Sequence, residues 1–349
     1  LVTGHDPATS AVELKQRLER EHGLDLAADL PQVSAALRSL VLAATNPVVS
    51  ERLRDVPDFL EKLSEVERDL GANTSETEID PLDAPPGTVI GGRFELVRRL
   101  GSGSTAVGLL VRDREAEGEA RVLKVAVDDN AARRLDAEAD VLAVLNGRRQ
   151  PRVVRIVETA PIQIGDRKAL LLESAGDETL ADVLRDRRRL SLDLLDRWGT
   201  DLLAALVSLD EAGVDHRDVK PSNLGIREQK SDRAKHLVLF DFSLAKASAA
   251  TISAGTPPYL DPFLGTGTRL HWDSAAERYA AAVTLFEMAT GHAPVYGDGE
   301  TAPQFVDRAT IEPGDFDPAV ADGLVRFFEK ALAKDAKQRH GTAGDMLAD

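Results

Sequence analysis

The sequence predicts an α+β fold: a small sheet with one helix, then a larger and mostly helical region, with a small all-helical unit in front. Three observations lead to this class. Residues 1–70 carry apolar side chains at helical spacing. Short strand-like runs flank a glycine-rich loop after Gly92, and helical patterns prevail beyond residue 173.

Start signals predict the N-terminal helical unit. Ser10 and Glu13 have the spacing of a capping box, in which each side chain reaches the other's free amide. Pro31 and Pro57 stand where helices can begin, because proline at the first helical position lacks only an amide that would be unbonded anyway. We expect about three to four helices here, with a role in packing, self-association or partner binding.

Residues 71–88 are rich in Pro, Gly and short polar side chains, and they are expected to form a linker. A second domain, residues 89–349, follows. Its elements are predicted in the order of a strand pair, a third strand, one amphipathic helix, two further strands, and two short strands among helices. The ranges are Phe94–Leu100, Gly108–Arg112, Arg121–Val127, the helix Ala131–Leu145, Val153–Glu158, Lys168–Glu173, a strand near Leu224, and Leu237–Phe240.

Composition excludes several classes of function. The 349 residues include 59 acidic and 43 basic side chains, a net charge of −16, which argues against nucleic acid or anionic membrane as a partner. The absence of cysteine excludes disulfides and Cys-ligated zinc. No apolar stretch reaches the roughly 20 residues that span a bilayer, and no secretory signal is visible, so a cytoplasmic location is expected. The chain does not begin with Met, so we expect a segment of a longer protein.

The glycine-rich loop between the first two predicted strands is a candidate phosphate site. Gly101, Ser102, Gly103 and Ser104 open it, and glycines let backbone amides approach phosphate oxygens without a Cβ in the way. An ordinary hairpin loop explains this motif alone equally well. Lys124 in the third strand could bridge the α- and β-phosphates.

Glu138 on the following predicted helix could hold Lys124 in an ion pair. For either residue alone, a surface charge is the simpler interpretation. In this order of elements, the paired interpretation is favoured.

The strongest signal is His-Arg-Asp-Val-Lys-Pro-Ser-Asn at residues 216–223, followed by Leu-Phe-Asp-Phe at residues 239–242. Asp218 can accept or orient an attacking hydroxyl, and Lys220 can neutralise charge on a transferring phosphoryl group. Asn223 and Asp241 supply the oxygen ligands that Mg²⁺ prefers. Phosphoryl transfer needs mostly positioning and charge neutralisation, and these residue types provide both.

With these motifs in this order, residues 89–349 resemble bacterial eukaryotic-like Ser/Thr protein kinases. The resemblance implies a two-lobed protein-kinase-like fold, with an N-lobe at about 89–172, a hinge at 173–176 and a C-lobe at 177–349. It implies ATP with Mg²⁺ or Mn²⁺, and protein substrates. It also implies an adenine pocket formed by Val122, the gatekeeper Leu172, and Glu173 and Ala175 of the hinge.

The resemblance extends to the activation segment. Lys220 matches the Ser/Thr-type signature, and residues 255–259 resemble the substrate-docking loop. Arg217 matches the arginine that reads activation-loop phosphorylation, with Thr251 and Ser253 as candidate sites. A narrower resemblance links the glycine loop, Asp-Phe-Ser and Tyr-Leu-Asp-Pro-Phe at 259–263 to large phage-defence kinases of the phage-growth-limitation type.

Three positions depart from the family pattern. Ser243 replaces the glycine of Asp-Phe-Gly, which should reduce the freedom of that loop to flip. Phe263 stands where a glutamate pairs with the late arginine, so Arg339 is expected to lack its usual partner. Glu277 stands where an aspartate anchors the catalytic loop, and its longer carboxylate is expected to do the same.

The adenine pocket departs further. Gly108 stands at the position of the valine above adenine, Val122 replaces a small alanine, and Gly225 replaces an apolar residue beneath the base. We hypothesise that Val122 partly restores the apolar contact above the base (the roof of the pocket), while the space beneath it (the floor) is left open. This should weaken or alter nucleotide binding without abolishing it.

The sequence therefore predicts a Ser/Thr protein kinase that transfers the γ-phosphoryl group of ATP to protein hydroxyls, autophosphorylation included. The alternative is a catalytically silent nucleotide-binding module that signals by shape. Ser243, Phe263 and the unusual pocket motivate the alternative. The protein substrate is not predicted.

Overall fold

A computed structural model describes residues 6–26, 33–73, 79–102, 106–148, 150–229 and 231–349. The chain forms two compact units, residues 1–78 and 79–349, which are described separately. Among the described residues, no helix combines the length and apolar character that crossing a bilayer requires.

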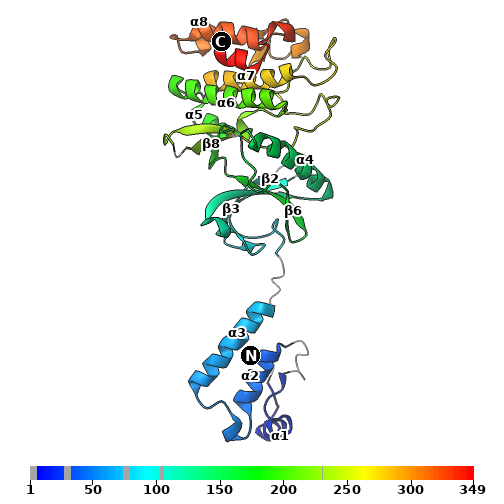
Figure 1. Cartoon of the computed structure of the whole chain (residues 1–349), viewed down its shortest axis with the longest axis vertical. Coiled ribbons are helices and arrows are strands. Elements are labelled where there is room, and N and C mark those ends of the chain that lie inside the picture. The colour runs from blue at the N-terminus through cyan, green and yellow to red at the C-terminus, as the bar shows by residue number, and fades with distance from the viewer. Residues whose placement is uncertain (1–5, 27–32, 74–78, 103–105, 149, 230) are drawn as a thin grey trace. The chain divides into compact units, whose positions relative to one another are not determined.

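The first unit is helical, as predicted (Figure 1). Ser10 caps its first helix by accepting from the Glu13 amide at 3.2 Å. The predicted capping box is incomplete, however, because the Glu13 carboxylate accepts from the amide of Thr9 at 2.9 Å instead of that of Ser10. Pro57 is the second residue of the last helix, whereas Pro31 lies outside the described residues. The elements are α1 (Ala11–Glu21), α2 (Ala35–Thr45), the 3₁₀ turn η2 (Val49–Glu51) and α3 (Val56–Asn73).

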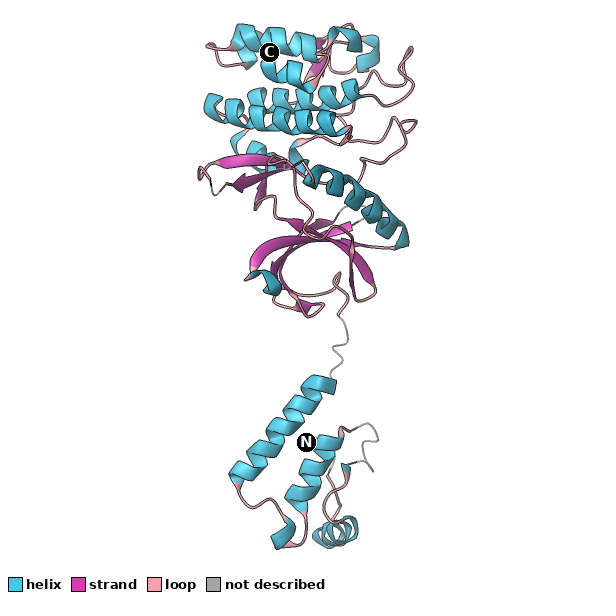
Figure 2. Ribbon diagram, viewed as in Figure 1, coloured by secondary structure: helices cyan, strands magenta, loops and turns pink. Residues whose placement is uncertain are grey.

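A strongly curled antiparallel sheet with one helix opens the second unit (Figure 2). Its strand order is β1-β2-β3-β4-β6-β5. β3 is buried along almost its whole length, and its alternate residues Val107, Leu109 and Val111 pack in one apolar cluster with residues of β2 and β4. The bounds are β1 (Val89–Ile90), β2 (Phe94–Ser102), β3 (Ala106–Asp113), β4 (Glu119–Ala126), α4 (Asp129–Asn146), β5 (Ile162–Ile164) and β6 (Arg167–Glu173).

The rest of the second unit is mostly helical, with a three-stranded sheet β7-β8-β9 beside it. Its centre is α7, whose residues are buried almost all round. The bounds are β7 (Glu178–Thr179), α5 (Leu180–Arg187), α6 (Leu192–Ala212), β8 (Leu224–Glu228), β9 (Lys235–Leu239), α7 (Ser274–Thr290), β10 (Val295–Tyr296), β11 (Ala309–Thr310), α8 (Ala321–Ala331) and α9 (Ala343–Ala348), with 3₁₀ turns at 114–116, 221–223, 303–305, 313–315 and 336–338.

Two segments differ from the prediction. Val153–Glu158 is not a strand, because it crosses from one sheet to the other and makes only isolated bridges to Leu239 and Leu172. The segment predicted as a linker is partly structured, since α3 runs to Asn73 and residues 79–88 lie on the first sheet. Asp80 holds this stretch by an ion pair with Arg167 at 2.6 Å.

A buried ion pair fastens the end of residues 241–263, which we call the activation segment. Arg339 contacts the Asp261 carboxylate at 2.6 Å, and both side chains are almost fully buried. The expectation that Arg339 lacks its partner is therefore wrong: the carboxylate comes from two positions before Phe263, whose ring packs 5.8 Å from the guanidinium. Arg269 adds a second cation to Asp261 at 2.7 Å.

Replacing Arg339 by alanine should reduce the free energy of unfolding by about 3–5 kcal/mol, because it leaves the Asp261 charge buried with one partner fewer. Urea unfolding measures this loss. The control Arg185→Ala removes an exposed ion pair with Asp182 and should change stability by less than about 0.5 kcal/mol. A loss of under about 1 kcal/mol for Arg339→Ala would show that the pair is not needed for stability.

Candidate functional site

A lysine and two carboxylates meet between the two sheets. Lys124 comes from β4 and Glu138 from α4, and the Lys124 Nζ lies 2.8 and 2.7 Å from the two Glu138 oxygens. Asp241, which follows β9, contacts the same Nζ at 2.6 Å. The structure thus brings together three predicted site residues that are up to 117 positions apart in the chain.

Attraction between opposite charges outweighs burial for Lys124 and Asp241, whereas burial raises the pKa of Glu138. Burial opposes the charge on Lys124, but attraction by Glu138 and Asp241 outweighs it and raises the pKa of the lysine. Burial likewise opposes the charge on Asp241, yet Lys124 lowers the pKa of that carboxyl to about 2, with help from the Ser243 hydroxyl. Lys124 therefore carries a positive charge and Asp241 a negative one at neutral pH.

The loop at residues 216–223 gathers around Asp218. Lys220 Nζ lies 2.7 Å from Asp218 Oδ2, and the Asn223 amide donates to the Asp218 carbonyl at 2.8 Å and to Oδ2 at 3.1 Å. Thr256 donates its hydroxyl to Asp218 Oδ1 at 2.8 Å and accepts from Lys220 at 2.7 Å. Thr256 was missed as a site residue, although its segment had been assigned to substrate docking.

Glu277 anchors this loop from α7. Its carboxylate accepts from the amide of His216 at 2.9 Å and from that of Arg217 at 2.9 Å. These bonds hold Arg217 in the left-handed region, φ 69°, which turns the backbone just before Asp218. The expectation that the longer carboxylate anchors the loop is confirmed.

His216 and Phe242 join the loop to the helix that carries Glu138. Their rings meet edge to face at a centroid distance of 4.6 Å, and both residues are buried. The Phe242 amide donates to Glu138 at 3.1 Å, so the position of Asp241 is tied to that of α4.

Asn223 and Asp241 offer a donor set that fits Mg²⁺. The Asn223 nitrogen donates to Asp218, which leaves the amide oxygen as the available metal ligand. Among the described residues no group of three or more His, Cys, Asp or Glu side chains has a metal-binding arrangement. Proteins commonly hold Mg²⁺ with one or two carboxylates together with substrate phosphates, and an amide oxygen is a further ligand of the same kind.

The predicted phosphate loop is described only in part. Gly101 pairs with Gly108 and Ser102 with Val107 in the β2–β3 ladder. Gly103 and Ser104 lie outside the described residues.

The predicted hinge, residues 173–176, lies against β8. A Cβ built on Gly225 would come within 2.6 Å of the Ala175 Cβ and closer still to the Ala175 carbonyl oxygen. Gly176, with φ +114°, likewise leaves no room for a side chain against the Ile226 carbonyl. The expectation of an open floor under the base is therefore wrong, because hinge backbone takes the space that a side chain at 225 would need.

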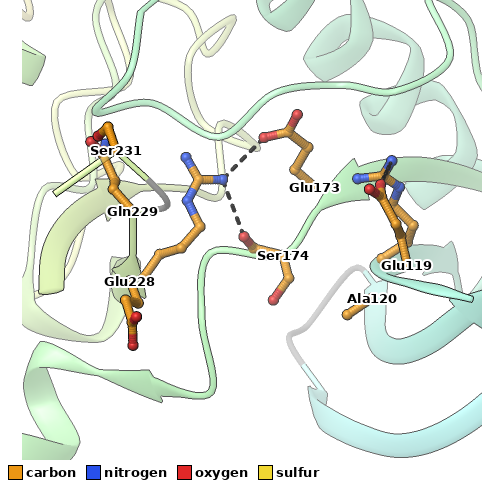
Figure 3. Close-up of a pocket in the computed structure, with 9 residues that line it drawn as sticks. Glu119, Ala120, Glu173, Ser174, Glu228, Gln229 and Ser231 are labelled. Carbon is orange, nitrogen blue, oxygen red and sulfur yellow. Dashed lines mark hydrogen bonds and ion pairs between the residues drawn. The ribbon is translucent and has the colours of Figure 1, made fainter. Parts of the chain in front are cut away.

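Glu173 and Ser174 of the predicted hinge also line a cavity of about 500 Å³ (Figure 3). Arg227 of β8 donates there to the Glu173 carboxylate at 3.0 Å and to the Ser174 carbonyl at 3.3 Å. Neither Lys124 nor Asp218 lines this cavity. Glu173 and Ser174 are thus bonded to β8 through Arg227.

Comparison with known proteins shows the family. The family model for the protein kinase domain matches residues 94–348, so the chain belongs to the protein kinase domain family. A crystal structure of a kinase domain superposes with a TM-score of 0.55 at 16% identity, covering 76% of this chain and 96% of that one, which shows the shared fold.

The curated relatives are bacterial kinases. "Probable kinase PglW" of Streptomyces coelicolor is 41% identical over 97% of this chain and 24% of its own length. "Probable serine/threonine-protein kinase PknB" of Bifidobacterium longum is 30% identical over 76% of this chain and 40% of its own length. The resemblance to bacterial Ser/Thr kinases is thus confirmed, and the chain spans a quarter to two fifths of these relatives.

A Gly108→Val variant should fold normally and bind ATP more tightly, by about 1–3 kcal/mol. The added Cβ meets the Leu100 Cβ at 3.5 Å, an ordinary contact, and extends the apolar roof. Titration calorimetry measures the affinity.

Gly225→Ala is the counterpart: its Cβ collides with the hinge, so it should lose about 1–3 kcal/mol of stability. A Gly225→Ala protein as stable as the wild type would contradict the close hinge contact.

Glu277 should make stability depend on pH. Burial raises its pKa from 4.5 to about 7, so between these values the folded protein keeps a proton that the unfolded chain releases. Stability then falls as pH rises through this window, by about 3 kcal/mol. Urea unfolding at several pH values tests this: the fall should be missing in Glu277→Gln and present in the control Glu329→Gln on α8. Identical pH profiles in all three proteins would contradict it.

Proposed function

We propose that residues 89–349 transfer the γ-phosphoryl group of ATP to Ser or Thr hydroxyls of proteins, including the chain itself. The arrangement of Lys124, Asp218, Asn223 and Asp241 carries this proposal, because it supplies positioning and charge at the points where phosphoryl transfer needs them. The names of the relatives, serine/threonine-protein kinases, support the acceptor class.

Each side chain has a distinct task in the proposed transfer. Lys124, held by Glu138, binds the α- and β-phosphates, and the amides around Gly101 and Ser102 cover them. Asp218 receives the substrate hydroxyl and orients its oxygen toward the γ-phosphorus. Lys220 lies on the same carboxylate and stabilises charge that moves onto the phosphoryl oxygens.

Asn223 and Asp241 hold Mg²⁺ or Mn²⁺. The metal, when bound, offsets the negative charge of the phosphates. Asp241 pairs with Lys124, so the carboxylate is ionised and close to the lysine proposed to bind phosphate.

Glu173, Ala175, Leu172 and Val122 contact the base in this proposal. Val122 and Leu172 are paired neighbours on β4 and β6, which supports a shared role in the proposed pocket. Ala175 lies on Gly225, so its backbone forms part of the pocket. Glu173 also bonds Arg227.

The alternative, a silent nucleotide-binding module, has less support. Its motivating features are Ser243, Phe263 and the odd pocket. Against it, Asp261 gives Arg339 a carboxylate partner, and the contacts of Lys124 with Glu138 and Asp241 support an active kinase. A role in phage defence, as in phage-growth-limitation kinases, is proposed from the similarity to PglW. We further propose a cytoplasmic protein whose N-terminal helices bind a partner or a second copy.

Autophosphorylation with labelled ATP and Mg²⁺, followed by mass spectrometry, tests the proposed reaction. Asp218→Ala should lose transfer by about 10²-fold or more, and Asp241→Ala should lose it comparably, since each removes charge or positioning at the reacting group. Asp186→Ala, an exposed residue of α5, is the matched control. Transfer that persists in Asp218→Ala would refute the assignment, whereas ATP binding without transfer in the wild type would favour the silent module.

A further inference from the structure

A small apolar cluster lies under the activation segment, apart from the main core. Trp272, Leu264 and Ala276 are buried in it, and Ile252 and Leu260 pack against them. We refer to these five residues as the Trp272 cluster. Ala276 belongs to α7, so the cluster joins the activation segment to the helix that anchors the catalytic loop through Glu277.

Ile252 ties the loop to this cluster. The Ile252 Cδ1 lies so near Gly265 that a Cβ on residue 265 would come within 2.6 Å of it. Gly265 also has φ +77°. Only glycine suits both conditions. A second tie runs from the Trp272 amide to the Ala249 carbonyl at 2.8 Å. These two ties hold the loop on both sides of Thr251, and neither of them involves a charged side chain.

Arg217 rests on the same tryptophan. Its guanidinium carbon lies 5.5 Å from the Trp272 ring centroid, within cation–π range, and its Nη1 donates to the Ser248 carbonyl at 3.1 Å. No carboxylate forms an ion pair with Arg217 in the described part of the chain. Its Nε and the Trp272 Nε1 are buried without a hydrogen-bond partner there. An aromatic face and one carbonyl thus hold the cation next to Asp218.

The candidate phosphorylation sites are exposed to solvent, whereas Arg217 is buried. Thr251 and Ser253 are exposed, while Ile252 between them is half-buried. Arg217 is only 8% exposed. A phosphoryl group on Thr251 or Ser253 would thus face solvent as long as Ile252 keeps its place.

We propose that Trp272 and Ile252 are positioning residues, which order the activation segment and Arg217 for transfer without phosphorylation of Thr251 or Ser253. Apolar burial supplies the ordering that a phosphate–arginine contact would otherwise supply. This inference rests on the proposed kinase function and adds how that activity is controlled.

The test measures phosphate transfer by the chain of residues 1–349 to casein as a generic acceptor, with Mg²⁺-ATP. The double variant Thr251→Ala/Ser253→Ala should stay within about threefold of the wild-type rate. Ile252→Ala should lose about tenfold or more in kcat/KM for casein while the KM for ATP stays unchanged. Leu270→Ala is the matched control, because Leu270 is two positions from Trp272 yet 59% exposed.

Trp272 needs a pair of variants because it is buried. Trp272→Phe keeps an aromatic face for Arg217 and should retain most activity, whereas Trp272→Ala should lose it. Hydrogen exchange at residues 248–256 should quicken in Ile252→Ala and in Trp272→Ala but not in Leu270→Ala. This exchange reports on the contact itself, whether or not a variant transfers phosphate.

Two results would overturn the proposal. One is a Thr251→Ala/Ser253→Ala protein that loses transfer and regains it with Thr251→Glu or Ser253→Glu. The other is an Ile252→Ala protein with unchanged transfer and unchanged exchange. A wild-type chain that binds ATP but transfers nothing counts against the proposed function instead, and exchange at residues 248–256 then decides on the positioning contact alone.

Discussion

The second unit depends on one buried ammonium group. Lys124 Nζ lies within 2.8 Å of Glu138 and 2.6 Å of Asp241, so a strand, a helix and the loop after β9 meet at a single cation. Removing such charges from water is costly, and only their mutual attraction and close hydrogen bonds offset that cost. The arrangement is therefore sensitive: a shift of α4 separates Glu138 from the lysine and leaves a buried carboxylate uncompensated. The positions of β4, α4 and the loop after β9 are thus coupled through the group that is proposed to bind phosphate.

Carboxylates hold the C-lobe part of the site in the same way. Glu277 reaches the amides of the catalytic loop, and Asp261 holds Arg339 and Arg269 at the end of the activation segment. Both acids are almost fully buried. Their side chains differ in length or position from those that the family resemblance implies, yet the geometry is retained. What the site requires is a carboxylate at a place in space, and a longer side chain or a shift of two residues can deliver it.

Much of the architecture was predictable from the sequence because local patterns determine it. The strand pairs around the glycine loop and the helix with Glu138 follow from periodicity, and they formed within a few residues of their predicted ends. Val153–Glu158 was misread because its apolar residues bury against two different sheets, which gives strand-like composition without a ladder. A one-dimensional pattern does not show which partners a buried segment meets.

Gly225 shows the same limit at the site. A glycine beneath the base suggests empty space when only sequence position is considered. In the folded chain that space holds the hinge backbone, and the Gly176 turn brings it there. Missing side-chain volume in a packed interior is usually filled by neighbours that move in. The two glycines are therefore better understood together, as the pair that lets the hinge and β8 approach. This close approach, fastened from behind by Arg227 on Glu173, limits how far the hinge can move away from the C-lobe. In the proposed function the nucleotide fits between a hinge held in this way and a strand that lacks a side chain at Gly108, and the proposal assigns the apolar contacts with the base chiefly to Val122 and Leu172.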